Sequence, residues 1–147
     1  ILLETDPNGI HSHGDGVLHI HPFNKLASGR DATLGEFFSA FGGHIDDTTL
    51  VLDTGEELVE GADCGGEPMV LKVARFDADD MERDPEIVTE DPAGVRFLKN
   101  REAFTIAMVP ADVDPPAPRP ERLTFLDMVS PNALTSDPSA PAPTTSE

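Results

Sequence analysis

Four of the five histidines of this chain lie within eleven residues, in the segment HSHGDGVLHIH. They form two His-x-His pairs on either side of the sequence Gly-Asp-Gly. Neutral imidazole is the commonest protein ligand for zinc and copper, so the spacing points first to metal binding. The candidate ligands are His11, His13, His19, His21 and Asp15.

A short β-hairpin would position these side chains. Glycine supplies the positive φ that tight loops need, so the segment 14–16 predicts the hairpin tip. A three-residue loop at 14–16 makes His11 face His19, places all four imidazoles on one face, and turns Leu18 and Ile20 toward a core. A two-residue turn at 15–16 shifts the register by one and places the two pairs on opposite faces. Only the first register makes a metal site.

The donor set selects among metal ions. Imidazole nitrogens without clustered Cys or Met favour Zn²⁺ or Cu²⁺ over Ca²⁺, Mg²⁺ or Cu⁺. Two other interpretations of the cluster stay open: a structural or pH-responsive surface, and a catalytic role. His44 is remote in sequence, and we expect it to be a surface residue and not a fifth ligand.

Length and charge limit the classes of partner. With 147 residues, the chain can bury one modest core. Its formal net charge of −18 argues against binding to nucleic acid or to anionic membrane surfaces, because phosphate groups would be repelled. A helix that spans a membrane needs about 20 consecutive apolar residues, and the sequence contains no such run. The first residue is Ile1, so we expect an upstream targeting or anchoring segment to be missing.

One motif tests the possibility of an enzyme. The segment LVLDTG, which ends at Gly55, resembles the Asp-Thr-Gly signature of aspartic proteases. Glu56 follows where that family has a small residue, and Asp-Thr-Gly is also an ordinary hairpin turn. The sequence contains no other convincing active site, so no catalytic residue is assigned.

The clearest helix signal follows the histidine segment. Thr33 and Glu36 form a capping box, and the Gly-Gly pair at 42–43 predicts the end of the helix. Leu34, Phe37, Phe38 and Phe41 recur at the spacing of one helix face and predict a buried stripe.

Alternating apolar residues predict the strands. The segment 48–59 predicts a hairpin that turns at 53–55, and 69–76 predicts a further strand. The segments 95–98 and 103–109 predict a second hairpin around 99–101, with Phe104, Ile106 and Met108 on one face. The acidic run 77–91 is expected to be a solvated loop.

These elements predict a small α+β domain with one short helix on a mostly antiparallel or mixed sheet. Their order suits a β-grasp-like arrangement. Residues 1–9 are expected to be a linker, 10–109 the domain, 110–135 an extended Pro-rich arm, and 136–147 a disordered tail. Within the arm, Pro115 to Pro120 is predicted to lie extended on the surface, and 123–129 is apolar enough to dock on the domain or on a partner.

The block GIHSHGDGVLHIHPF, residues 9–23, followed by Ala-Thr-Leu-Gly at 32–35, resembles a group of extracytoplasmic actinobacterial proteins with a GIHTHGDGVIHIHPF-like block, usually after a membrane segment. A more distant bacterial group with an HTHD-x-x-G-x-IHIE block and a TLGQFF helix is also similar. The resemblance covers about 9–43 and implies an exported domain whose histidines bind metal, without an established reaction. Two functions from different classes follow: a non-catalytic zinc- or copper-binding module, and an accessory subunit of a cell-envelope or extracellular assembly that docks by its sheet edge and Pro-rich arm.

Overall fold

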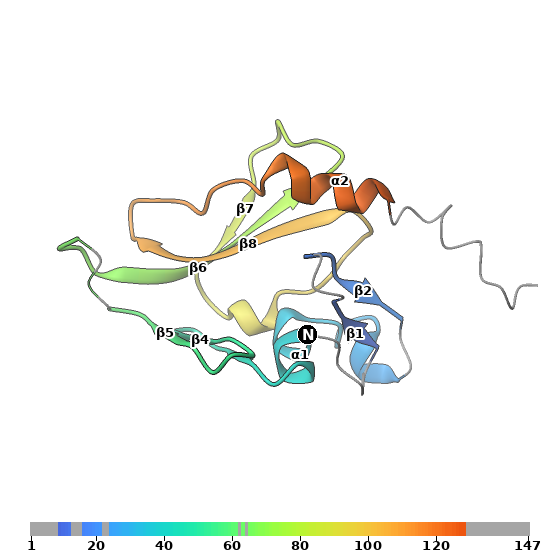
Figure 1. Cartoon of the computed structure of the whole chain (residues 1–147), viewed down its shortest axis with the longest axis horizontal. Helices are drawn as coiled ribbons and strands as arrows, with labels where there is room; N and C mark the ends of the chain where they lie inside the picture. Colours follow the sequence, from blue (N-terminus) through green and yellow to red (C-terminus); the bar gives the residue numbers. More distant parts are fainter. Residues whose placement is uncertain (1–8, 13–15, 22–23, 62, 64, 129–147) are drawn as a thin grey trace, which may run out of the picture.

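A computed structural model describes residues 9–12, 16–21, 24–61, 63 and 65–128. The chain is α+β, with three small antiparallel sheets and two α-helices (Figure 1). The strands are β1 (Ile10–His11), β2 (His19–Ile20), β3 (His44–Ile45), β4 (Thr49–Val51), β5 (Glu57–Val59), β6 (Met69–Asp77), β7 (Glu86–Val88) and β8 (Glu102–Pro110). The helices are α1 (Leu34–Ala40) and α2 (Pro120–Met128), with 3-10 turns at Lys25–Ala27 and Pro92–Gly94.

The predicted Phe-rich helix is confirmed as α1. The Thr33 hydroxyl accepts a hydrogen bond of 3.2 Å from the Glu36 amide, which caps the first turn. At the other end Gly42 has φ +83°, and the Gly43 amide donates to the Phe38 carbonyl at 2.8 Å, so the two glycines end the helix as predicted. Leu34 and Phe38 are buried, while Phe37 and Phe41 pack half-buried against the same cluster.

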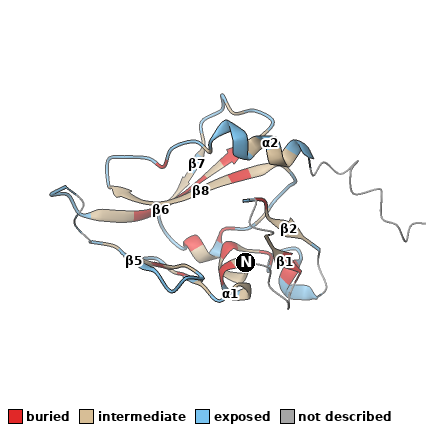
Figure 2. Cartoon of the chain, in the orientation of Figure 1, coloured by how far each residue is buried: buried red, intermediate tan, exposed pale blue. Residues whose placement is uncertain are grey.

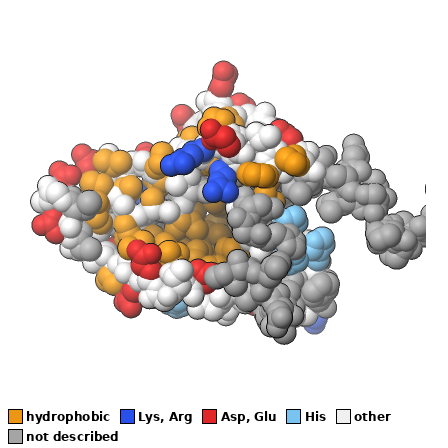
Figure 3. Space-filling view, viewed as in Figure 1, with side chains coloured by type: hydrophobic (Ala, Val, Ile, Leu, Met, Phe, Trp, Pro, Cys, Tyr) orange, Lys and Arg blue, Asp and Glu red, His pale blue; other side chains and the backbone are white. Residues whose placement is uncertain are grey.

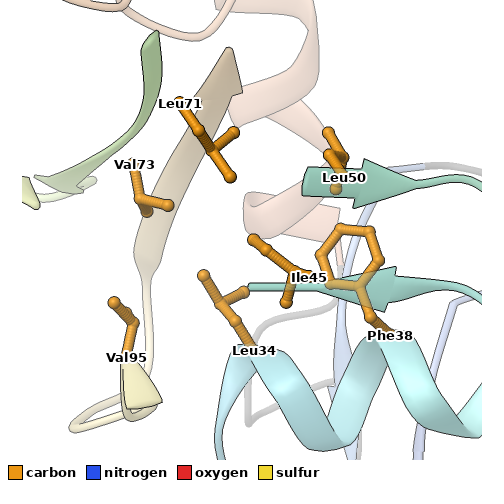
Figure 4. Close-up of a cluster of buried hydrophobic side chains, with 7 residues drawn as sticks. All are labelled: Leu34, Phe38, Ile45, Leu50, Leu71, Val73 and Val95. Atoms are coloured by element: carbon orange, nitrogen blue, oxygen red, sulfur yellow. The ribbon is translucent and has the colours of Figure 1, made fainter. Parts of the chain in front are cut away.

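The main core lies between α1 and the three-stranded sheet β7-β6-β8 (Figure 2). Figure 4 shows how its buried side chains converge from four elements and one loop. They are Leu34 and Phe38 from α1, Ile45 from β3, Leu50 from β4, Leu71 and Val73 from β6, and Val95. The opposite face of β6 is also covered, because Ala74 and Phe76 form a separate cluster with Ala103 against which Leu123 of α2 packs. β6 is therefore the central strand of the fold.

The predicted hairpin of 95–98 with 103–109 is wrong. The second segment is a strand, β8, but it pairs antiparallel with β6 over nine residue pairs, from Met69↔Pro110 to Asp77↔Glu102. The first segment instead lies beside the start of α1, where Arg96 forms an isolated bridge with Thr33 and the Phe97 amide donates to the Ala32 carbonyl. A nine-residue partner strand offers a full ladder of backbone hydrogen bonds, which a four-residue segment does not.

The hairpin predicted at 48–59 is confirmed as β4 and β5. Leu50 pairs with Leu58, and the Gly55 amide closes the turn on the Leu52 carbonyl at 2.9 Å. Gly55 has φ +83°, which explains the need for glycine there. Asp53 and Thr54 are exposed in this turn. The Asp-Thr-Gly sequence therefore serves as a hairpin turn.

Two elements differ from the predictions. The acidic run 77–91 contains the strand β7, which pairs with β6 through Val73↔Val88. The Pro-rich region contains α2, so the predicted single helix is corrected to two. The described strands form three separate antiparallel sheets and not one mixed sheet, so the β-grasp-like arrangement is not confirmed. No helix within the described ranges has the length and apolar character needed to cross a membrane.

A buried lysine attaches the Pro-rich region to the sheet. Lys72 of β6 is 6% exposed, and its ammonium donates to the Ala111 and Val113 carbonyls at 2.9 and 2.8 Å. The same group contacts the Asp114 carboxylate at 3.2 Å. Residues 113–119 then run without helix or strand to α2. The prediction that Pro115 to Pro120 lies extended on the surface is corrected at both ends, because Pro115 is buried and Pro120 is the first residue of α2. The predicted tail at 136–147 lies outside the described residues.

We expect Lys72→Met to lower the free energy of unfolding by about 1–2 kcal/mol, because hydrogen bonds from a charged donor are lost. The larger expected effect is local, since the segment between β8 and α2 loses its hydrogen bonds to Lys72. Trypsin should then cleave faster after Arg122, in α2. Urea denaturation and timed proteolysis would measure the two effects, with the exposed Lys25→Met as control. An unchanged cleavage rate would contradict this role for Lys72.

Candidate metal centre

The histidine segment folds as the β1–β2 hairpin. Its strands pair antiparallel through Ile10↔Ile20 and His11↔His19. The His21 amide extends the pairing by donating to the Gly9 carbonyl at 2.7 Å. His11 thus faces His19, which is the register predicted for a three-residue loop and not the one predicted for a two-residue turn.

The three described histidines of the hairpin share one face. Their ring centroids are 5.7 Å apart for His11 and His19, 5.6 Å for His11 and His21, and 6.3 Å for His19 and His21. The rings are nearly parallel, with interplanar angles of 13° to 27°. Figure 3 shows histidine side chains gathered at the surface beside β2. We call His11, His19 and His21 the histidine row.

Alternation along the strands explains this placement. Ile10 is 1% exposed and forms a small buried cluster with Ala27 and Ala32. Leu18 and Ile20 pack half-buried against this cluster, as predicted, so they anchor β2 by the face opposite to the histidines. Because side chains alternate across a strand, the histidines lie on the face opposite to this cluster.

The spacing of the row can be compared with that of a metal site. With metal–nitrogen distances of about 2.0–2.1 Å, two imidazoles on one tetrahedral ion hold their ring centroids roughly 5 to 5.5 Å apart. The observed spacings are slightly wider, and no group of three or more His, Cys, Asp or Glu among the described residues could hold an ion as it stands. Side-chain rotations would be needed to converge the nitrogens. The predicted ligands His13 and Asp15 lie outside the described residues.

A cavity of about 560 Å³ adjoins the histidine row. His19 and His21 line it on one side, and residues of β8 and of α2 line it on the other. The guanidinium of Arg122 in α2 packs against the hairpin, since a Cβ added at Gly16 would lie 3.3 Å from its Nη1. Sequence reasoning missed this cavity, because its walls come from segments more than 75 residues apart in the chain. The basic and apolar residues of 97–106 and 118–126 carried no signal of their own.

His44 lies apart from the row, as predicted for a surface residue. It is exposed in β3, and its Nε2 lies 2.9 Å from the Asp46 carboxylate. The Thr48 amide donates to Asp46 at 2.9 Å. This amide, with the His44 ring and the Thr49 amide, lowers the pKa of Asp46 from 3.8 to about 2.

The carboxyl resonance of Asp46 is therefore expected to titrate with a midpoint of about 2 in an NMR pH series. Because the folded pKa is depressed, the stabilisation by the charged carboxylate is present above 3.8 and is lost as the pH falls through about 2. The His44→Ala variant should raise the midpoint partway toward 3.8, since the Thr48 amide, which is the larger cause, remains. A midpoint near 3.8 in the unchanged chain would contradict the hydrogen-bonded turn.

Comparison with known proteins adds no family assignment. No protein family, curated protein or solved structure matches the chain. The resemblance of residues 9–43 to exported actinobacterial proteins, and the extracytoplasmic location that it implies, therefore stay predictions.

Proposed function

We propose that this chain is a non-catalytic metal-binding module that holds one Zn²⁺ or Cu²⁺ ion on the β1–β2 hairpin. The observation that carries the proposal is the proximity of the three imidazoles of the histidine row, whose ring centroids lie within 6.3 Å of one another on one face. His13 or Asp15, the other two ligands predicted from the sequence, would complete the ligand set.

The surroundings favour a cation at this place. The net charge of −18 attracts cations to the protein as a whole. Neutral imidazoles would supply nitrogen donors suited to borderline ions, and the buried Ile10 side of the hairpin would limit the movement of the strands that carry them. An exported chain, as the actinobacterial resemblance implies, would bind its ion outside the cytoplasm, either free or anchored by an upstream segment.

The test is metal stoichiometry. The full chain is treated with chelator, desalted, incubated with excess Zn²⁺ or Cu²⁺, desalted again and analysed for metal content. The proposal expects about one equivalent of ion, with binding weakening at acidic pH because protons compete for the imidazole nitrogens. Less than about a tenth of an equivalent of either ion would overturn it, since occupancy at excess ligand reports whether a site exists.

A second function is favoured by one observation. In the described sheet β7-β6-β8, strand β8 is at the edge over nine residues. Long edge strands present unpaired backbone groups that can pair with another chain. If no metal binds, an accessory subunit of a cell-envelope or extracellular assembly that docks by this edge and by the Pro-rich region becomes the better proposal.

A further inference from the structure

The cavity beside the histidine row lies between the edges of two strands. Residues 16–21, which contain β2, and residues 99–106, which contain the start of β8, line it as unbroken runs. Because the side chains of a strand alternate between two faces, a cavity over one face would be lined by every second residue. The unbroken runs therefore indicate that the cavity faces the backbone edges of β2 and β8. Among the described strands, these two belong to different sheets and do not pair with each other.

The hydrogen-bond pattern shows which backbone groups of β8 point toward the cavity. The Ala78 amide donates to the Arg101 carbonyl at 2.9 Å, and this pair continues the register of β6 with β8. Hydrogen-bonded and non-hydrogen-bonded pairs alternate along an antiparallel ladder, so Thr105 exchanges its hydrogen bonds with β6. Phe104 and Ile106 then direct their N–H and C=O groups away from β6, to the open edge that lines the cavity.

The same argument orients the edge of β2. The His21 amide donates to the Gly9 carbonyl at 2.7 Å, so His19 is hydrogen-bonded to β1 in the same ladder. Leu18 and Ile20 then turn their backbone groups away from β1, to the edge that lines the cavity.

Four half-buried residues thus present backbone groups to the cavity from its two sides. We call them the slot residues, and the space between them the slot: Leu18, Ile20, Phe104 and Ile106. Within the described part of the chain, no hydrogen bond engages their outward N–H and C=O groups. An extended chain placed between the two edges would supply partners to both.

The side chains on the two sides of the slot alternate in step. Those of the slot residues all lie on the core side, where Phe97 packs both against the main core and against the small cluster under Ile10. His19 and Thr105, the residues between them, lie on the opposite side. A strand inserted in the slot would therefore place apolar side chains toward the core at every second position.

The edge of β8 lacks the features that usually prevent an added strand. Natural edge strands are blocked by charges, prolines or bulges, but residues 103–109 contain no charge and no proline, and the register with β6 is unbroken. The five residues from Glu102 to Ile106 line the cavity, which gives a slot about 16 Å long at about 3.3 Å per residue.

We propose that this slot binds an extended peptide segment of another protein, which adds a strand between β2 and β8 and joins β1-β2 and β7-β6-β8 into one sheet. An extended backbone carries donors and acceptors along both of its edges, so it complements both open edges at once. A helix or a globular surface would satisfy neither row of backbone groups. The inference deepens the second proposed function, docking by the edge of β8, and does not depend on a bound metal ion.

The probe is the neutral peptide acetyl-Ser-Val-Thr-Val-Thr-Val-Ser-amide, added to the chelator-treated full chain and followed by amide hydrogen exchange in NMR spectra. In the free chain, the amides of the slot residues should exchange at least about tenfold faster than the Thr105 amide, which is bonded to β6. Saturating peptide should slow the slot residues at least about tenfold and leave Thr105 unchanged, because only outward amides gain partners.

Two matched controls test the role of the backbone. The same peptide, N-methylated at its central valine and at the threonine before it, keeps its side chains but loses one donor toward each edge, so its affinity should be at least about tenfold lower. On the protein, Ile106→Pro should weaken binding at least about tenfold relative to Ile106→Ala. Both variants shorten the side chain, but only proline removes the outward amide, which β6 does not use.

Three results would overturn the slot. The first is no binding of the parent peptide up to about 1 mM, or equal binding of the N-methylated peptide. The second is slow exchange of the slot residues in the free chain, because the slot would then be filled by the chain itself or by a second copy. The third is slowing confined to Phe104 and Ile106, which would leave docking by the edge of β8 standing. Zinc stoichiometry tests the metal-binding proposal separately from all three.

Discussion

Replacing His19 with alanine is expected to abolish the metal site, reducing bound zinc from about one equivalent to less than about a tenth after desalting. His19 pairs directly with His11 across the hairpin and lies on the same face as His21. Loss of an outer partner of a metal ligand costs about 10–100-fold in affinity, so loss of a ligand itself should cost at least as much. Calorimetric titration with Zn²⁺ would measure the change.

Three further variants make this result interpretable. His44→Ala removes a histidine that pairs with Asp46, and it should bind zinc like the unchanged chain. His21→Ala changes an exposed side chain, so its loss of zinc could not be attributed to unfolding. The double variant His11→Ala, His13→Ala should also lose the metal while α1 stays folded. Full zinc occupancy in either His19→Ala or His21→Ala would exclude the histidine row as the site.

Phe38→Ala should lower the free energy of unfolding by about 3–5 kcal/mol, as for other large aromatic truncations in a core. Phe38 is 5% exposed and lies in the buried cluster with Ile45 and Leu50. Its ring is 5.5 Å from that of Phe37 and 5.0 Å from that of Phe41, so alanine would leave a cavity among three aromatic rings. A typical domain of this size has only about 5–15 kcal/mol of stability, so the variant should be close to unfolding.

Urea denaturation followed by far-UV circular dichroism would measure this loss, because the chain contains no Trp or Tyr as an intrinsic fluorophore. Leu98→Ala is the control, since Leu98 is 58% exposed and should change stability by less than about 0.5 kcal/mol. A change below about 1 kcal/mol for Phe38→Ala would show that the cluster around α1 is not the principal core.

Local signals in the sequence predicted the local parts of the fold. The cap at Thr33, the Phe stripe and the turn at Gly55 each specify structure within a few residues, and each is confirmed. The same holds for the facing of His11 and His19, since the glycines at the hairpin tip limit the register to two choices. The sequence left two registers open, and the structure selects the one in which His11 faces His19.

The remaining elements depend on contacts distant in sequence. Strand β8 follows an apolar segment, Val95 to Leu98, yet it pairs with β6, and no local pattern distinguishes these partners. β7 is three residues within an acidic run, so its strand character is set by the free edge of β6. α2 begins at Pro120, and proline is favoured at the first position of a helix, but the surrounding prolines concealed this signal. The cavity beside the histidine row needs β8 and α2 in place, because both contribute to its lining.

Two phenylalanines connect the hairpin to the rest of the molecule. Phe37 and Phe97 each pack both against the main core and against the small cluster under Ile10. The strands that carry the histidines are thus not an independent appendage, and any opening of the hairpin disturbs side chains shared with the main core. Ligand binding to a folded state alone stabilises that state by about 2.7 kcal/mol at a hundredfold excess over Kd. Through these shared rings, an ion held at the surface would slow amide hydrogen exchange as far away as β6, so that metal availability would set the lifetime of the whole folded chain.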